Sequence, residues 1–91
     1  MPAGQTKISQ EALVQFAKEK IAEELKIEVD EVDTDTTFAS LGLDSITCIF
    51  FMEQIENYLD IRLNPIDFWD YPTVNSYVLH LMKTHFPQGN G

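Results

Sequence analysis

Apolar residues recur at helical spacing in two stretches near the ends of the chain. In the first stretch the apolar positions are four residues apart, which places them on one face of a helix: Leu13, Ala17, Ile21 and Leu25. Ser9 stands just before this helix as a favourable N-cap, and Glu11 lies in its first turn, where it suits the helix dipole. The second stretch follows Thr73, another good N-cap, and carries Val74, Tyr77, Val78, Leu81 and Met82. The pattern therefore predicts a helix at each end.

A third long helix, from about Ser45 to Leu59, is predicted to have two different apolar faces. At about 100° per residue, one side collects a core stripe: Cys48, Phe51, Met52, Ile55 and Leu59. The opposite side collects Ile46, Phe50, Glu53 and Asn57. The spacing thus predicts that Phe51 is buried and Phe50 exposed. Two apolar residues on an outward face make a candidate partner surface.

Two further segments lie between these helices. Residues 26–43 show no sustained period and predict a long loop, although five apolar residues should pin it to the core: Val29, Val32, Phe38, Leu41 and Leu43. Asn64-Pro65 predicts a short helix in which Asn64 is the cap and Pro65 the first helical residue. Ile66, Phe68 and Trp69 should supply its apolar contacts, and Pro72 should end it.

The chain shows no alternating strand pattern and no hairpin signal. The predicted fold class is therefore all-α: a small four-helix bundle of three main helices and a short third helix, with a long loop between helices 1 and 2. The 91 residues suffice for one domain. We expect it to span residues 9–86, between a flexible lead at 1–8 and a flexible tail at 87–91.

The net charge of −9 is concentrated in one part of the chain. Residues 27–61 contain nine acids and no Lys or Arg, whereas six acids and six bases balance elsewhere. This distribution argues against nucleic acid as a partner and favours proteins with basic surfaces, although an acidic face can also serve solubility alone. No apolar run is long enough to cross a membrane. The single cysteine excludes an internal disulfide and fits a reducing compartment, so we expect a cytoplasmic protein. We also expect it to be a monomer.

Ser45 occupies the predicted first position of the central helix, directly after its N-cap, Asp44. Unpaired N–H groups and the positive end of the helix dipole meet there, and a phosphate attached to Ser45 would be stabilised. Position alone favours the simpler interpretation, that Ser45 merely tolerates a helix start.

The sequence motif around Ser45 favours attachment of a phosphate-containing group at this residue. "DTTFASLGLDSI" (Asp35 to Ile46) resembles the attachment-site signature of acyl carrier proteins, and "FWDYPTV" resembles the usual lead into their last helix. The resemblance implies that Ser45 carries 4′-phosphopantetheine, transferred from coenzyme A by a phosphopantetheinyl transferase that Asp44 helps to dock. It implies a carrier without catalytic residues of its own. It also implies a partner-binding surface made of Leu43, Ile46, Thr47, Phe50 and Glu53.

The resemblance further suggests a pathway. "LGLDS" looks more like polyketide-synthase carriers, and Thr47 and Phe50 replace acids that are common in fatty-acid-synthesis carriers. We therefore expect a polyketide or hybrid-pathway carrier that serves acyl-loading and ketosynthase-type enzymes with basic docking surfaces. A fatty-acid-synthesis carrier and an unmodified acidic interaction module are the alternatives.

Two other kinds of chemistry fit the sequence poorly. A calcium-binding EF-hand loop is matched at four positions, by Asp33, Asp35, Thr37 and Asp44. Phe38, however, stands where that loop needs a glycine for its sharp turn. At most weak surface binding of divalent ions is therefore expected. "GLDSI" lacks the G-x-S-x-G elbow of serine hydrolases. His80 and His85 both fall on the last helix, and Cys48 falls on a core stripe. No metal site and no catalytic residue is predicted.

Overall fold

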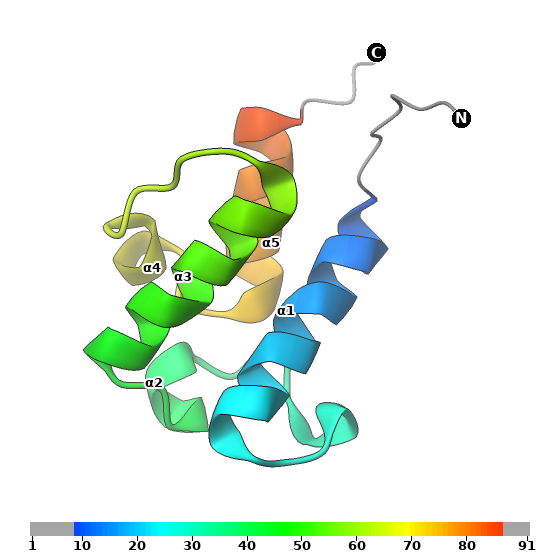
Figure 1. The fold of residues 1–91 in the computed structure, drawn as a ribbon, viewed down its shortest axis with the longest axis vertical. Coiled ribbons are helices and arrows are strands. Elements are labelled where there is room, and N and C mark those ends of the chain that lie inside the picture. The colour runs from blue at the N-terminus through cyan, green and yellow to red at the C-terminus, as the bar shows by residue number, and fades with distance from the viewer. Residues whose placement is uncertain (1–8, 87–91) are drawn as a thin grey trace.

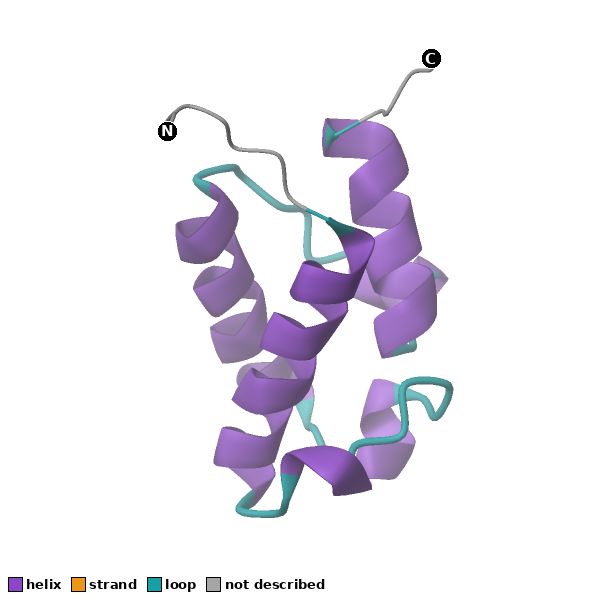
Figure 2. Ribbon diagram, turned by 90° about the vertical axis from the view of Figure 1, so that its right-hand side faces the viewer, coloured by secondary structure: helices purple, strands orange, loops and turns teal. Residues whose placement is uncertain are grey.

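The computed structural model describes residues 9–86, in which three long helices lie side by side along the long axis of the molecule (Figure 1). These are α1 (Gln10–Leu25), α3 (Ser45–Leu59) and α5 (Val74–His85). The remaining elements are short: a 3₁₀ turn η1 (Val29–Glu31) and the helices α2 (Phe38–Leu41) and α4 (Asp67–Asp70). Figure 2 shows helices and loops but no strand in this range. The predicted all-α bundle is confirmed, whereas the predictions for 1–8 and 87–91 lie outside the described residues.

Each long helix begins at the cap that the sequence predicts. The Ser9 hydroxyl accepts a hydrogen bond from the Ala12 N–H at 3.0 Å. The Asp44 carboxylate accepts from the Thr47 N–H, and the Thr73 hydroxyl accepts from the N–H three residues on. These bonds satisfy N–H groups that have no partner inside the helix, which is why the three helices start where they do.

One aromatic ring from each of four helices joins the centre of the core: Phe38 of α2, Phe51 of α3, Phe68 of α4 and Tyr77 of α5. The Phe38 and Phe68 rings meet edge to face with centroids 5.3 Å apart, and Phe68 stacks on Tyr77 at 4.5 Å. Phe38 also contacts Phe51 at 5.7 Å. Because α2 and α4 are too short to be stable alone, these rings are what hold them in the bundle.

The loop at 26–43 is tied to the start of α5 as well as to the core. The Phe38 N–H donates to the Pro72 carbonyl at 2.8 Å. The Asn75 side chain donates to Thr34 Oγ1 at 2.9 Å and to Asp35 Oδ1 at 2.7 Å. Among the loop's apolar residues, Val32, Phe38 and Leu43 are buried, while Val29 and Leu41 pack partly buried against the core. The prediction that this segment is pinned to the core is confirmed, whereas the prediction of a loop throughout is wrong, because η1 and α2 form within it.

The prediction for α4 is wrong in two respects. The helix begins at Asp67, two residues later than expected, and Asn64 Oδ1 accepts from the Ile66 N–H to close a turn before the helix. Of its apolar residues only Phe68 is buried, whereas Ile66 and Trp69 are exposed. Successive residues of a helix point about 100° apart, so one short turn can direct only one large side chain into the core. Leu25, at the end of α1, is likewise only half-buried rather than part of a fully buried stripe.

Candidate functional site

Ser45 lies at an exposed position, as the first residue of α3. The preceding turn depends on Gly42, whose φ of 112° is a conformation that residues with a Cβ rarely adopt. This turn ends α2 and places Asp44 and Ser45 at the end of the molecule where α2 and α3 meet (Figure 1). Ser45 is therefore accessible to a large enzyme, and its backbone is held by the helix that follows.

Asp44 caps α3 and keeps its negative charge at neutral pH. Its Oδ1 accepts from the Thr47 N–H at 2.8 Å. Hydrogen bonding with Thr47 lowers the pKa of Asp44 below its ordinary value, with a smaller contribution from the Ile46 N–H. The helix start thus presents a fixed carboxylate next to the Ser45 hydroxyl.

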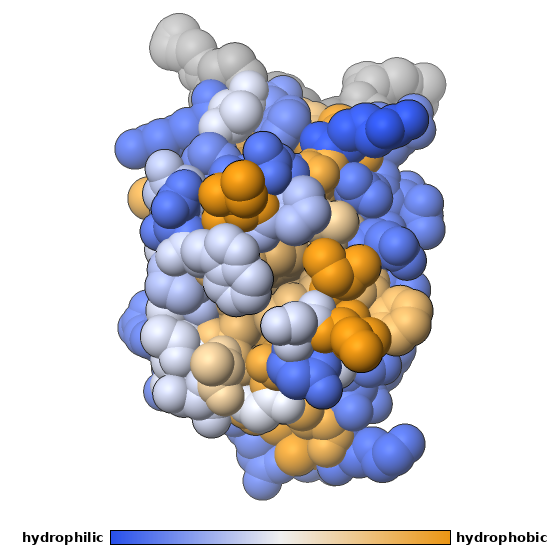
Figure 3. All heavy atoms as spheres, turned by 90° about the vertical axis from the view of Figure 1, so that its left-hand side faces the viewer, coloured by the Kyte–Doolittle hydropathy of each residue, from blue (hydrophilic) through white to orange (hydrophobic). Residues whose placement is uncertain are grey.

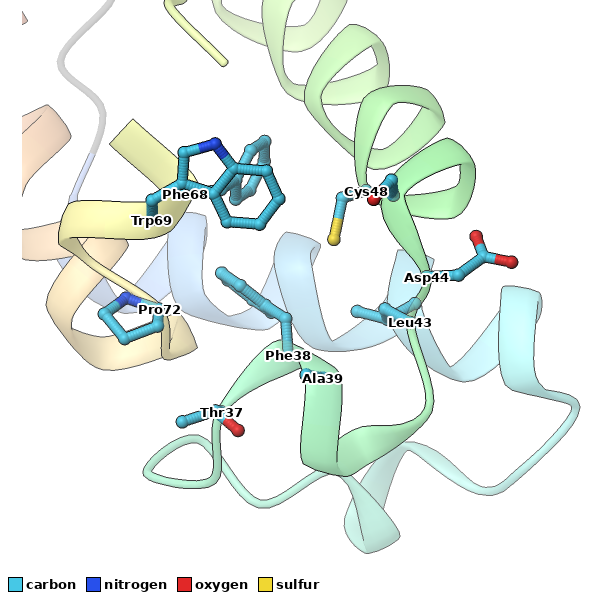
Figure 4. Close-up of a pocket in the computed structure, with 10 residues that line it drawn as sticks. Thr37, Phe38, Ala39, Leu43, Asp44, Cys48, Phe68, Trp69 and Pro72 are labelled. Atoms are coloured by element: carbon cyan, nitrogen blue, oxygen red, sulfur yellow. The ribbon is translucent and has the colours of Figure 1, made fainter. Parts of the chain in front are cut away.

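A cavity of about 400 Å³ lies beside Ser45, between α2, the start of α3 and α4 (Figure 4). Phe38, Phe68 and Trp69 contribute aromatic walls, and the sulfur of Cys48 points into the space between them. The polar side chains at the cavity are those of Thr37, Asp44 and Ser45. The predicted attachment residue thus borders a mostly apolar hollow.

The outward face of α3 has the orientation that the helical angle predicts. Phe50 is 54% exposed and Ile46 is 68% exposed, whereas Phe51 is 2% exposed. Glu53 is exposed, and Thr47 is half-buried. Figure 3 shows that the face of the molecule bearing α3 and α4 mixes orange apolar residues with blue hydrophilic ones. The structure therefore brings Ile46, Phe50 and Glu53 together on one accessible surface.

Leu43 does not belong to that surface. Its side chain is only 4% exposed and packs in the core cluster, where it also lines the cavity. The prediction that partners contact this side chain stays a prediction, and the burial of Leu43 places it in the core rather than on the outward face. Its direction follows from the turn at Gly42, which points Leu43 inward before Asp44 starts the helix.

Trp69 is the residue near Ser45 that sequence reasoning missed. The sequence predicts that it supplies an apolar contact of the short helix, but its side chain is 65% exposed and lines the cavity. The sequence contained a usable signal: Phe68 and Trp69 are neighbours in a short helix, so they cannot both face inward.

The other candidate chemistries find no site within residues 9–86. There, no group of three or more His, Cys, Asp or Glu side chains could hold a metal ion. His80 Nε2 lies 3.1 Å from Asp67 Oδ2, and neither histidine lines the cavity at Ser45. Cys48 is buried, and this burial raises the pKa of its thiol, which disfavours the reactive thiolate. No helix in the described part of the chain is long and apolar enough to span a membrane.

Comparisons with known proteins point to one family. The family described as "Phosphopantetheine attachment site" matches residues 15–81. A phenolphthiocerol/phthiocerol polyketide synthase of Mycobacterium tuberculosis is 35% identical over 75 residues. The match covers 82% of this chain and 4% of the synthase, so the chain spans only a small part of that relative.

Two solved structures share the fold. A free-standing peptidyl carrier protein from a secondary metabolic pathway of Acinetobacter baumannii has 29% identity and a TM-score of 0.77, with 82% of this chain and 94% of that chain covered. An acyl carrier protein from Anabaena sp. PCC 7120, with a variant phosphopantetheinylation-site sequence, has 21% identity and a TM-score of 0.82 over 94% of this chain and 98% of that one. The second likeness concerns the fold alone. Because the family match covers most of the helical domain, the chain belongs to the carrier proteins that bear a phosphopantetheine attachment site.

Proposed function

We propose that Ser45 is the attachment residue, and that the protein holds acyl intermediates as thioesters and presents them in turn to biosynthetic enzymes. The observation that carries this proposal is the exposed hydroxyl of Ser45 at the first position of α3, inside the stretch that matches the family. In this role the chain performs no chemistry of its own. It supplies a fixed tether point and surfaces that other enzymes recognise.

The residues around Ser45 fit a 4′-phosphopantetheine group. Among the described residues, none forms a hydrogen bond with the Ser45 side chain, so its oxygen is free to attack the pyrophosphate of coenzyme A. The P–O–P bond then breaks, the phosphopantetheinyl group passes to Ser45, and adenosine 3′,5′-bisphosphate leaves. When bound, the group supplies a flexible arm that ends in a thiol. The positive end of the α3 dipole favours a phosphodiester there. The ionised Asp44 opposes it electrostatically, yet it also gives an incoming transferase or its metal ion a carboxylate to bind.

The outward face of α3 is the proposed docking surface for partners. Ile46 and Phe50 provide exposed apolar area, Thr47 lies half-buried between them and the core, and Glu53 adds a negative charge on the same helix. We infer that transferases, acyl-loading enzymes and ketosynthase-type enzymes meet it with apolar pockets rimmed by basic residues. Because Leu43 is buried, it acts only through the position of the turn.

A polyketide or hybrid pathway is the proposed setting. The similarity to a polyketide synthase supports it, and the structural likeness to a peptidyl carrier suits a hybrid pathway. Thr47 and Phe50 also make the start of α3 less acidic than is usual in fatty-acid-synthesis carriers.

The attachment can be tested by intact-mass measurement after incubation with coenzyme A and a broad-specificity phosphopantetheinyl transferase. The wild-type protein should gain one phosphopantetheinyl group, and Ser45→Ala should gain none. Ser40→Ala is the matched control, because Ser40 is an exposed serine in the neighbouring helix α2 and should leave the mass gain intact.

The same measurement addresses the alternative of an unmodified acidic interaction module. That alternative predicts no mass gain in any variant. A gain that persists in Ser45→Ala would move the attachment to another residue and contradict the proposal.

A further inference from the structure

We propose that Trp69 is a specificity-determining residue of this carrier, whose indole binds planar aromatic or conjugated acyl groups tethered at Ser45. The inference rests on the proposed attachment at Ser45. Trp69 on α4 and Ser45 on α3 line the same cavity of about 400 Å³, which lies within the range of small-molecule pockets. The cavity is thus within reach of a flexible chain fixed at its rim.

The walls of the cavity suit a flat π-system. The Phe38 and Phe68 rings meet edge to face, with an interplanar angle of 80°, and the Trp69 ring lies beside them at the opening (Figure 4). Aromatic rings gain from stacked and edge-to-face contacts with other rings, and a sulfur near a ring edge adds to this attraction. The Cys48 sulfur points into this space. A saturated acyl group of the same size would gain only from burial of its apolar surface.

The polarity of the cavity selects the acyl end of the arm rather than its middle. The pantetheine portion contains amide groups, and burying an amide without hydrogen-bond partners is unfavourable. Within residues 9–86, the cavity has few polar side-chain groups, those of Thr37, Asp44 and Ser45 and the indole N–H of Trp69, and Oδ1 of Asp44 already caps α3. We infer that the arm stays in water and that its acyl end folds back against the aromatic walls.

The exposure of Trp69 explains why this residue, rather than Phe68, sets the preference. Phe68 is buried and stacks on Tyr77, so its ring is needed for the fold. Trp69 leaves most of its indole uncovered, and an acyl group lying on it would remove that surface from water. Replacement of Trp69 should therefore change binding without unfolding the protein. It is also the single tryptophan of the chain, so its fluorescence reports on this site alone.

The test loads Ser45 with two matched arms that carry either a benzoyl or a cyclohexanecarbonyl thioester. Both rings have the same number of carbons, but only benzoyl is planar and conjugated. The measured quantity is the rate of thioester cleavage by hydroxylamine, divided by the rate for the same thioester on free pantetheine. We expect the benzoyl group to be protected about two- to tenfold more than the saturated ring, the range that aromatic stacking supplies. The fluorescence of Trp69 should change with benzoyl and much less with cyclohexanecarbonyl.

Two variants assign the effect to the indole. Trp69→Leu keeps an apolar side chain but removes the flat ring, and it should abolish the difference between the two groups at an unchanged melting temperature. Tyr58→Leu removes another partly exposed aromatic side chain, one that stacks on Phe16 and does not line the cavity, and it should keep the difference. Equal protection of both groups in the wild type, or a preference that survives in Trp69→Leu, would overturn the inference.

A failed loading reaction would count against the proposed function rather than against the cavity. In that case the benzoyl and cyclohexanecarbonyl thioesters of N-acetylcysteamine are titrated into the unmodified protein while Trp69 fluorescence is followed. Tighter binding of the benzoyl compound supports the aromatic site, and equal binding or none contradicts it.

Discussion

The hydroxyl of Tyr77 is buried without a hydrogen-bond partner among the described residues. The side chain is fully buried, and its ring stacks on Phe68. Burial raises the pKa of Tyr77 well above its ordinary value of 10.0, and the nearby charges of Asp67 and Glu56 raise it further. The ring thus contributes to the core while the hydroxyl is left in an unfavourable place.

Removal of this hydroxyl should stabilise the protein. Tyr77→Phe keeps the ring and eliminates a buried polar group, so the free energy of unfolding should rise by about 1–2 kcal/mol. Urea titration at neutral pH measures the change. A loss of stability would show that the hydroxyl has a partner, such as a bound water.

The stability of Tyr77→Phe should also depend on pH differently from that of the wild type in the alkaline range. Because the folded state raises the pKa of Tyr77, the hydroxyl ionises more readily in the unfolded chain than in the folded one. The wild type should therefore lose stability as the pH rises above about 10, near the ordinary value. Tyr77→Phe should lack this part of the loss, so its advantage should grow in that range.

Helix α3 has a core face and an exposed face, and two adjacent phenylalanines lie one on each. Phe51 contacts the rings of Phe38 and Phe68, with centroids 5.7 and 6.0 Å away. Phe50 points outward and lines a groove against Lys20 and Glu24 of α1. One helix can therefore serve both stability and recognition, with the two functions assigned to different residues.

A substitution on the core face should lower stability, whereas one on the exposed face should weaken partner reactions. Phe51→Ala should lower the free energy of unfolding by about 3–5 kcal/mol, because it leaves a cavity between aromatic rings. Phe50→Glu should change stability by about 0.5 kcal/mol or less, yet weaken coupling to the cognate enzymes, because it places a charge where an apolar contact is proposed. Chemical denaturation and a partner assay on the loaded carrier measure the two quantities.

A reversed outcome would invert the assignment of the faces. If Phe50→Glu unfolds the protein while Phe51→Ala is nearly neutral, Phe50 must be the core residue. If Phe50→Glu leaves all partner reactions unchanged, the docking surface lies elsewhere.

For the whole molecule, the uneven charge should control how fast partners arrive. The nine acids of residues 27–61 belong to the loop, to α3 and to the two residues that cap α3, the segment that surrounds Ser45. Such a field attracts basic surfaces and is screened over about 10 Å at 0.1 M salt. It therefore acts on the approach of enzymes more than on the stability of the bundle.

Salt and a pair of charge variants test this steering. The kcat/KM of the phosphopantetheinyl transferase for this carrier should fall by about tenfold as salt is raised from low to high concentration. Glu53→Gln, on the outward face of α3, should lower the low-salt value and flatten the salt dependence. Glu11→Gln makes the same charge change in α1, outside the acidic segment, and should do so much less. Equal effects of the two variants would contradict steering by the acidic segment and would leave solubility as the role of its charge.

The amino-acid pattern was enough to predict the three long helices and their starting residues, whereas Ser45 was proposed as the attachment residue from a motif resemblance. The helices and their starts are local features: side chains four residues apart share a face, and a cap bonds an N–H three residues away. The division of α3 into the Phe50 and Phe51 faces follows from the same geometry.

The burial of Leu43, the exposure of Trp69 and the cavity beside Ser45 depend on how distant segments of the chain pack together. The helix α4 is too short to show a period, so its pattern cannot say which of its apolar residues faces inward. The direction of Leu43 depends on how α2 docks against α3. The cavity is lined by residues from 37 to 72 that lie on three helices and their connections. Such a space exists only when these helices pack together, because no segment of the chain contains it alone.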